Sequence, residues 1–283
     1  MRGLEQRPAW LKKSIINSPA IGTTMAVLKE YGLNTVCQSA RCPNIFDCFS
    51  RKTATFLILG NTCTRNCSFC AVKKGRPANA DVDEPQHIVE AVSVLGLSHV
   101  VITSVTRDDL PDGGAGQFVK TIEALKNKKG DAVEIEVLVP DFKGDREALE
   151  AVVGASPDIF SHNIETVPRL YRAIRPQADY NRSLEALRFA KEIKPDLCTK
   201  SGVMAGFGET KSEVVSVMAG LKAAGCDIFT IGQYLRPSTE QIAVERFVTP
   251  DEFLGFKKIG LEMGFEKIES GPFVRSSYRE AKT

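Results

Sequence analysis

Length, composition and charge exclude several classes of protein before any motif is considered. A chain of 283 residues can bury roughly three quarters of its unfolded surface, so it needs no disulfide staples. With 37 Lys and Arg against 35 Asp and Glu, its net charge of +2 does not call for nucleic acid or a membrane as partner. Since it has neither a run of 18 apolar residues nor an apolar N-terminal leader, we expect a cytoplasmic protein.

The N-terminal part of the chain carries three of the eight cysteines. A helix is predicted over residues 24–31 and ends before Gly32. The loop CQSARCPNIFDC follows, with Cys37, Cys42 and Cys48 at the spacing C-x4-C-x5-C. Three thiolates would leave one corner of a four-iron cluster without a protein cap, so either another residue or a ligand would have to complete it.

A second cysteine triplet follows the first predicted strand. Residues 53–60 (TATFLILG) form a short apolar run, and CTRNCSFC places Cys63, Cys67 and Cys70 at the spacing C-x3-C-x2-C. Three thiolates on one loop can hold three irons of a cubane cluster and leave the fourth iron open to a ligand. Zinc and simple thiol chemistry remain alternatives, although a zinc knuckle would need a second Cys or His pair.

From residue 53 onwards, apolar strands alternate with amphipathic helices. The strands predicted after the first cover residues 99–105, 132–140, 158–165, 198–205 and 228–234. The predicted helices cover residues 85–95, 116–126, 145–153, 183–193, 211–224 and 250–263. Near-continuous apolar strands between helices indicate a parallel sheet covered by helices. The pattern predicts an α/β fold, a partial (βα)6 barrel of the TIM type, with a doubly wound sheet as the alternative.

Such folds place their chemistry at the carboxyl ends of the strands, where this chain has several polar residues. Asn163 and Glu165 follow the fourth predicted strand and could hydrogen-bond a ribose. The fifth strand runs into a glycine-rich loop, in which Gly206 would let the backbone approach a ligand closely. Glu209, in the same loop, is either a ligand-binding residue or the beginning of the next helix.

Other residues near these strand ends have less specific interpretations. The segment around Asp108 is interpreted as a charged turn, and Cys198 and Cys226 as small buried hydrophobes. The segment LYRAIRPQADYNRS could dock an acidic protein surface through four arginines, which are Arg169, Arg172, Arg175 and Arg182.

Together these motifs resemble those of the lipoyl synthases, a family within the radical S-adenosylmethionine (radical SAM) superfamily. The resemblance rests on six segments between about residues 34 and 278, namely CQSARCPNIFDC, TATFLILGNTCTRNCSFCAV, SVTRDDLPDGGA, HNIETVPRLYRAIRPQADYNRSL, KSGVMAGFGET and GPFVRSSY. It implies two [4Fe-4S] clusters and SAM as cofactors. Cys63, Cys67 and Cys70 would hold the cluster that cleaves SAM, and Phe69 would lie near the adenine.

The resemblance also assigns the first cysteine triplet and the C-terminal segment RSSY. The triplet would hold an auxiliary cluster whose fourth iron is capped by Ser277, the second serine of RSSY. The expected metal ligands are therefore Cys37, Cys42, Cys48, Cys63, Cys67, Cys70 and Ser277. The expected SAM-binding residues are Phe69, Asn163, Glu165, Gly206 and Glu209.

The implied reaction inserts two sulfur atoms, donated by the auxiliary cluster, at C6 and C8 of an octanoyl chain bound to a lysine of a carrier protein. That carrier would be a lipoyl domain or the glycine-cleavage H protein, and a ferredoxin or flavodoxin would supply electrons to a monomeric enzyme. The implied parts are an N-terminal extension over 1–52, a radical SAM barrel over 53–265 and a C-terminal tail over 266–283. A methylthiotransferase and a non-enzymatic iron-sulfur or zinc protein remain alternatives.

Overall fold

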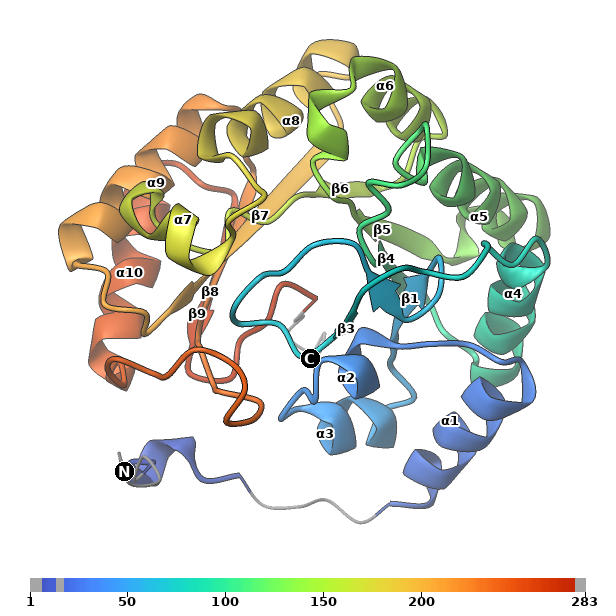
Figure 1. Cartoon of the computed structure of the whole chain (residues 1–283), viewed down its shortest axis with the longest axis horizontal. Coiled ribbons are helices and arrows are strands. Elements are labelled where there is room, and N and C mark those ends of the chain that lie inside the picture. The colour runs from blue at the N-terminus through green and yellow to red at the C-terminus, as the bar shows by residue number, and fades with distance from the viewer. Residues whose placement is uncertain (1–6, 14–17, 278–283) are drawn as a thin grey trace.

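A seven-stranded parallel sheet forms the centre of the fold. The computed structural model describes residues 7–13 and 18–277, and its strands are ordered β1-β4-β5-β6-β7-β8-β9 around a curved sheet (Figure 1). The strands are β1 (Thr55–Ile58), β4 (His99–Ser104), β5 (Glu134–Leu138), β6 (Ile159–Ser161), β7 (Cys198–Ala205), β8 (Ile228–Gln233) and β9 (Lys267–Gly271). All neighbouring strands pair in parallel, which confirms the predicted partial barrel.

Helices cover the outer face of this sheet (Figure 1). They are α4 (Glu84–Leu95), α5 (Ala115–Lys129), α6 (Arg146–Gly154), α8 (Tyr180–Ile193), α9 (Lys211–Ala223) and α10 (Pro250–Glu262). The short helix α7 (Tyr171–Ile174) lies inside the ring of these helices (Figure 1). Short 3-10 turns occur at Ala9–Leu11, Gly130–Ala132, Phe142–Gly144 and Pro168–Leu170. Helix α8 begins three residues before its predicted start, because the Asp179 side chain accepts a hydrogen bond from the backbone N–H of Arg182 and caps it there.

Strand β9 has no counterpart among the strands predicted from sequence. Its sequence, KIESG, alternates charged and apolar residues and lacks the apolar run that marks the other strands. It nevertheless pairs with β8 over five residue pairs and buries Ile268 and Glu269. The barrel sheet therefore continues past residue 265, into the segment that the sequence assigns to the tail.

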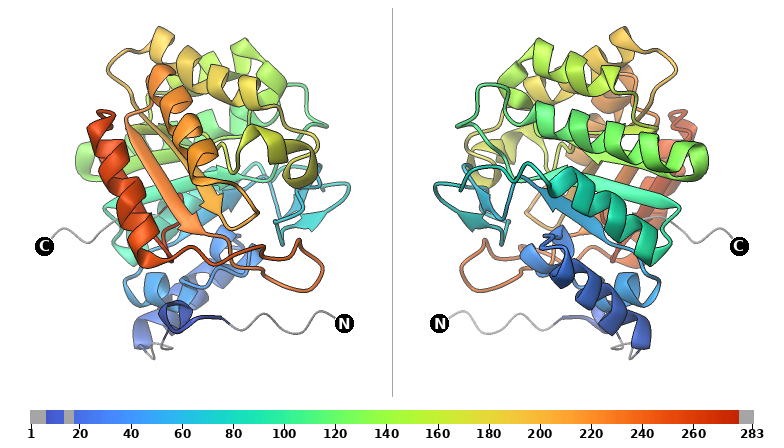
Figure 2. Two further views of the ribbon diagram at one scale, coloured as in Figure 1. Left: turned by 90° about the vertical axis from the view of Figure 1, so that its left-hand side faces the viewer. Right: turned by 90° about the vertical axis from the view of Figure 1, so that its right-hand side faces the viewer.

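The N-terminal segment lies on the open side of the barrel, between β1 and β9 (Figures 1 and 2). It contains α1 (Pro19–Glu30), α2 (Val36–Ser39) and α3 (Ile45–Ser50). Helix α1 begins earlier than predicted, because the Ser18 side chain caps the backbone N–H of Ala20 and Pro19 occupies the first helical position. Within the described ranges, β1 pairs only with β4 and β9 only with β8, so the sheet does not close on itself.

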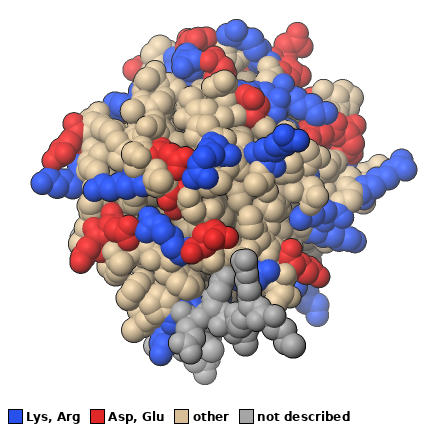
Figure 3. All heavy atoms as spheres, turned by 60° about the vertical axis from the view of Figure 1, so that its left-hand side comes forward, with Lys and Arg blue, Asp and Glu red and all other residues tan. Residues whose placement is uncertain are grey.

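Charge is mixed over the surface. The face drawn in Figure 3 carries Lys and Arg side chains interspersed with Asp and Glu, in keeping with the net charge of +2. Among the described residues, the structure contains no helix that is both long and apolar enough to cross a membrane.

Candidate functional site

A single cavity of about 780 Å³ brings the two cysteine triplets together. All eight cysteines are free thiols, and both triplets line this cavity. Their loops come from the N-terminal segment and from the end of β1. The C-terminal residues Arg275, Ser276 and Ser277 line the same cavity, while Tyr278 lies outside the described residues.

The loop after β1 is closed at its base and tied to neighbouring loops. The two short strands β2 (Thr62–Cys63) and β3 (Lys73–Lys74) pair in parallel and bring the ends of the loop together. The backbone N–H of Ser68 donates to the carbonyl of Ile174, at the end of α7, at 2.9 Å. These contacts hold the loop in a conformation in which Cys63, Cys67 and Cys70 all line the cavity.

The first triplet meets the C-terminal tail across most of the length of the chain. Asn44, between Cys42 and Cys48, donates its amide N–H to the carbonyl of Phe273 at 2.7 Å. Lys13 donates to the Asn44 side-chain oxygen at 3.0 Å and lies over the Phe273 ring at 5.4 Å. Arg275, in the tail, lines the same cavity as Cys42. These contacts join segments 229 residues apart and place the tail beside the first triplet.

Burial keeps several of these thiols protonated in the absence of a cation. It raises the pKa of Cys37 and of Cys70 to about 12 in each case, and it also raises the pKa values of Cys48 and Cys67. A group of irons would supply the positive charge that buried thiolates require. In the described part of the chain, no three His, Cys, Asp or Glu side chains converge as closely as a single metal ion needs.

Three other residues that line the cavity have polar side-chain atoms without protein partners. Within the described residues, Asn163 Oδ1, Arg175 Nε and Ser104 Oγ are buried and lack a hydrogen bond, and all three residues line the cavity. Glu165 lies next to them, accepts a hydrogen bond from Asn163 Nδ2 at 3.1 Å, and has its pKa raised by burial. Buried polar atoms are normally satisfied, so these residues fit a polar ligand.

Two of the residues predicted to bind SAM have structural partners instead of facing the cavity. The Glu209 carboxylate accepts hydrogen bonds from the backbone N–H groups of Gly206 and Phe207 at 2.7 and 2.8 Å. A Cβ at Gly206 would lie 2.3 Å from Gln233 Nε2, so the glycine is needed for packing against β8. Phe69 lines the cavity and lies 6.4 Å from the Phe207 ring.

The four arginines that the sequence suggests as a docking surface do not share one role. Arg175 is buried, lines the cavity and donates to the carbonyls of Asn163 and Ile164. Arg182 pairs with buried Asp141 at 2.8 Å. The docking interpretation is therefore wrong for these two, whereas Arg172 is exposed and Arg169 forms an exposed pair with Glu213.

Nothing in the sequence distinguishes Arg175 from its neighbours, because all four arginines belong to one polar segment. The missed cavity residues Tyr234 and Met204 likewise look like ordinary strand residues. Only the direction in which each strand and turn presents its side chain separates a cavity residue from a surface or core residue.

Known proteins identify the fold and the family. The model of the Radical SAM superfamily matches residues 57–221. Methylornithine synthase has a similar fold, with a TM-score of 0.58 at 14% identity over 93% of this chain and 86% of that one. The chain is 54% identical to the lipoyl synthase of Rubrobacter xylanophilus over 98% of its length and 86% of the relative's. It is 56% identical to that of Caldanaerobacter subterraneus subsp. tengcongensis over 96% and 95%.

The chain belongs to the lipoyl synthase family. It is a radical SAM enzyme of lipoate biosynthesis, and its cofactors are SAM and two [4Fe-4S] clusters. Membership of the lipoyl synthase family removes the methylthiotransferase, the zinc protein and the electron carrier as alternatives. The buried thiols and the unpaired polar atoms of the cavity fit this set of cofactors.

Gly232 in β8 lies against the backbone of Val274 in the tail, and this close packing leads to a first prediction. A Cβ at Gly232 would lie 2.0 Å from the carbonyl oxygen of Val274 and 3.2 Å from Arg275 Nη1. We expect Gly232→Ala to lower the free energy of unfolding by about 1–3 kcal/mol, or to push the tail off the cavity. Urea unfolding and iron content under anaerobic conditions measure both effects.

Gly255→Ala is the matched control, because a Cβ at Gly255 in α10 meets nothing within 4 Å. Alanine in that helix should leave stability unchanged or raise it by up to about 1 kcal/mol. Equal stability and iron content in Gly232→Ala and the unmodified protein would contradict the packing of the tail against β8.

Proposed function

We propose that the cavity holds both clusters through the two cysteine triplets and admits an octanoyl chain attached to a lysine of a carrier protein. The carrier would be an octanoylated lipoyl domain or the glycine-cleavage H protein, and the electron donor a ferredoxin or a flavodoxin. The observation that carries the proposal is that both triplets and Ser277 line the same cavity of about 780 Å³. A carbon on the chain could then reach both the site of SAM cleavage and the sulfur donor.

Each triplet has a separate task in this proposal. Cys63, Cys67 and Cys70 would ligate the cluster that binds SAM. The auxiliary cluster would be held by the N-terminal triplet, Cys37, Cys42 and Cys48, together with Ser277 of the C-terminal tail. When bound, these groups supply a 5'-deoxyadenosyl radical and two sulfur atoms, which the reaction needs because no side-chain acid or base opens an unactivated C–H bond near pH 7.

The protein itself binds and orients SAM. Asn163 and Glu165, which both line the cavity, would accept hydrogen bonds from ribose hydroxyls. Arg175, which lines the cavity, would balance the SAM carboxylate with its positive charge. Phe69 and Tyr234, which line the cavity on either side of Phe207, provide an apolar wall for the adenine.

We infer three parts in the chain from these roles. Residues 1–52 form an extension that carries the auxiliary triplet, and residues 53–271 form the barrel, extended past residue 265 to include β9. The remaining residues form a tail that carries Ser277. The extension and the tail lie together because of the Asn44 to Phe273 hydrogen bond, so neither would complete the auxiliary site alone.

Replacing Ser277 should separate the two halves of the reaction. A serine oxygen is a harder ligand than a thiolate and a weaker match for iron, which suits a cluster that gives up sulfur. We expect Ser277→Ala to retain SAM cleavage to deoxyadenosine while lipoyl formation falls by at least about tenfold. Single-turnover assays that count both products from one sample give the two rates.

Ser276→Ala controls for a general disturbance of the tail, since Ser276 lines the same cavity next to Ser277. Loss of SAM cleavage in Ser277→Ala, with folding unchanged, would contradict the division between the two cysteine triplets.

The function as a whole is tested by the mass of the product. The protein is reconstituted anaerobically with iron and sulfide, then given SAM, a reductant and an octanoyl-lysyl peptide. We expect the peptide to gain two sulfur atoms and lose two hydrogens, with deoxyadenosine formed alongside. Deoxyadenosine without a sulfur gain would contradict the proposed substrate, and neither product from protein containing both clusters would contradict the proposed assignment of the cavity.

A further inference from the structure

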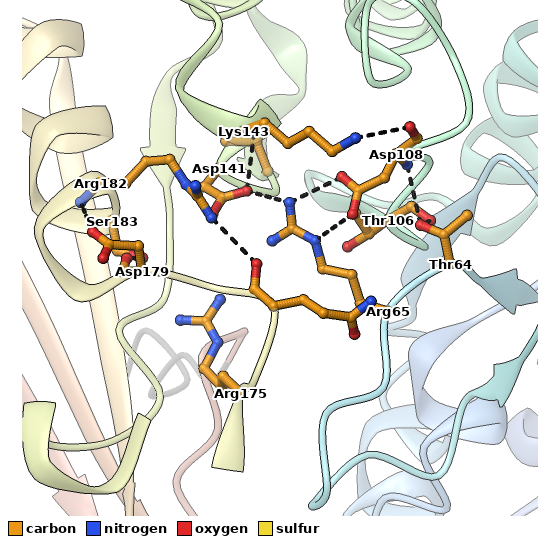
Figure 4. Close-up of polar contacts among 12 residues, drawn as sticks. Thr64, Arg65, Thr106, Asp108, Asp141, Lys143, Arg175, Asp179, Arg182 and Ser183 are labelled. Carbon is orange, nitrogen blue, oxygen red and sulfur yellow. Dashed lines mark hydrogen bonds and ion pairs between the residues drawn. The ribbon is translucent and has the colours of Figure 1, made fainter. Parts of the chain in front are cut away.

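Arg65 lies between two cysteines of the SAM-cluster loop, yet its side chain takes no part in lining the cavity. Arg65 is 5% exposed, and its guanidinium points into a buried ionic network (Figure 4). Its Nε and Nη2 donate to the two carboxylate oxygens of Asp108 at 2.8 and 3.0 Å. Nη2 also donates to Asp141 at 2.6 Å. One arginine of the loop thus joins the ends of β4 and β5.

Asp141 connects this network to helix α8. Its side chain is fully buried, and its second oxygen accepts from Arg182 Nε at 2.8 Å (Figure 4). Burial opposes ionisation of Asp141, but its hydrogen bonds to Arg65 and Arg182 hold its pKa well below the usual range. Two arginines and two aspartates balance in charge within this network, and Lys143 Nζ donates to the backbone carbonyl of Asp108 at 3.0 Å at its edge.

The backbone beside Arg65 is held against the end of β4 by Thr64. The Thr64 hydroxyl donates to the carbonyl of Thr106 at 2.9 Å and accepts from the backbone N–H of Asp108 at 3.1 Å. The Thr64 backbone N–H donates to the same Thr106 carbonyl at 3.0 Å. Thr64 thus joins the cysteine loop to the segment after β4, and the Arg65 to Asp108 ion pair joins the same two segments.

The result of this arrangement is a pair of hydrogen bonds to one cysteine. The backbone N–H of Arg65 donates to Cys63 Sγ at 3.4 Å, and that of Thr106 donates to the same sulfur at 3.3 Å. Hydrogen bonds to a ligand sulfur stabilise the more negative, reduced form of an iron-sulfur cluster and so raise its reduction potential. If the ionic network holds the N–H groups of Arg65 and Thr106 in place, their effect on the reduction potential stays constant.

We propose that Arg65 is a positioning residue that holds both N–H donors on Cys63 and thereby sets the reduction potential of the SAM-cleaving cluster. The proposal rests on the proposed assignment of Cys63 as a ligand of that cluster. A lysine at this position would keep the charge but lose the planar fork that binds Asp108 through two nitrogens and reaches Asp141 as well.

The test is a redox titration of the full-length protein containing both clusters. The midpoint potential is followed by EPR on the signal that changes when SAM is added, in the unmodified protein and in Arg65→Lys. We expect the potential of Arg65→Lys to be more negative, with the same iron content. Arg146→Lys is the control, because Arg146 pairs with Glu192 on the surface and should leave the potential unchanged.

Thr64→Val is a second variant of equal size and charge that should shift the potential in the same negative direction. If Arg65→Lys loses its clusters, Asp108→Asn is titrated in its place, because it keeps Arg65 but removes the carboxylate charge that its Nε and Nη2 bind, and it should shift the potential in the same negative direction. An unchanged or more positive potential in the cluster-containing variant would overturn the proposal. Cys63→Ala tests its premise, since a retained SAM-responsive signal there would overturn the ligand assignment instead.

Discussion

Cys67→Ala abolishes SAM cleavage if the loop after β1 holds the cluster as proposed. Cys67 lines the cavity together with Phe69, and burial raises the pKa of its thiol. Removing a direct ligand should cost more than the roughly 10–100-fold loss that follows from changes around a metal site. We therefore expect deoxyadenosine formation to fall below detection, and lipoyl formation with it.

Cys198→Ala provides the matched control, because Cys198 is a half-buried cysteine that does not line the cavity. Its deoxyadenosine yield should equal that of the unmodified protein. Iron content and the EPR signal that responds to SAM should fall only in Cys67→Ala. Normal deoxyadenosine formation in Cys67→Ala would refute the ligand assignment.

Lys200→Met should destabilise the fold by about 3–5 kcal/mol, because it leaves a buried carboxylate without its main partner. Lys200 in β7 donates to both oxygens of Glu136 in β5 at 2.9 and 3.0 Å, and the two side chains are 5% and 1% exposed. Ser161 in β6 donates to the same carboxylate at 3.1 Å. The ion pair thus ties three neighbouring strands together inside the barrel.

The pH dependence of this effect follows from the pKa of Glu136. Burial opposes its ionisation, but Lys200 and His99 outweigh burial and lower the pKa below its usual value. In the unmodified protein, the contribution of the pair is present above the ordinary pKa of glutamate and is lost as pH falls through the lowered one. Without Lys200, burial dominates and raises the pKa of Glu136. Protonation of Glu136 at lower pH therefore reduces the destabilisation of the variant.

We therefore expect the destabilisation by Lys200→Met to be larger at pH 7 than at pH 5. Urea unfolding of the cluster-free protein at both pH values gives the two differences. The double variant Lys200→Met with Glu136→Leu should recover most of the lost stability, since an apolar pair can replace a buried ion pair. A loss that is independent of pH, or one that the double variant does not recover, would contradict this account.

The spacing of the cysteines within each triplet was sufficient to predict an iron-sulfur site, because ligands of one loop are close in space whenever they are close in sequence. The barrel was predictable for a similar local reason. Apolar runs such as residues 55–58 belong to strands buried on both faces, and amphipathic helices lie between them. Strand β9 was not predicted from the sequence, because it alternates charged and apolar residues and buries Glu269.

The sequence by itself thus determined the two triplets, the α/β class and, through the order of its motifs, the resemblance to lipoyl synthases. The sequence placed Ser277 near Cys42 only through the resemblance, and the structure shows both in one cavity. The tertiary structure alone decided that Arg175 lines this cavity while Arg182 binds Asp141. The physical reason is that these relations depend on contacts between distant segments, such as Asn44 to Phe273, and on the direction of each side chain. Neither is encoded in spacing along the chain, and both arise only when the strands curve into a barrel.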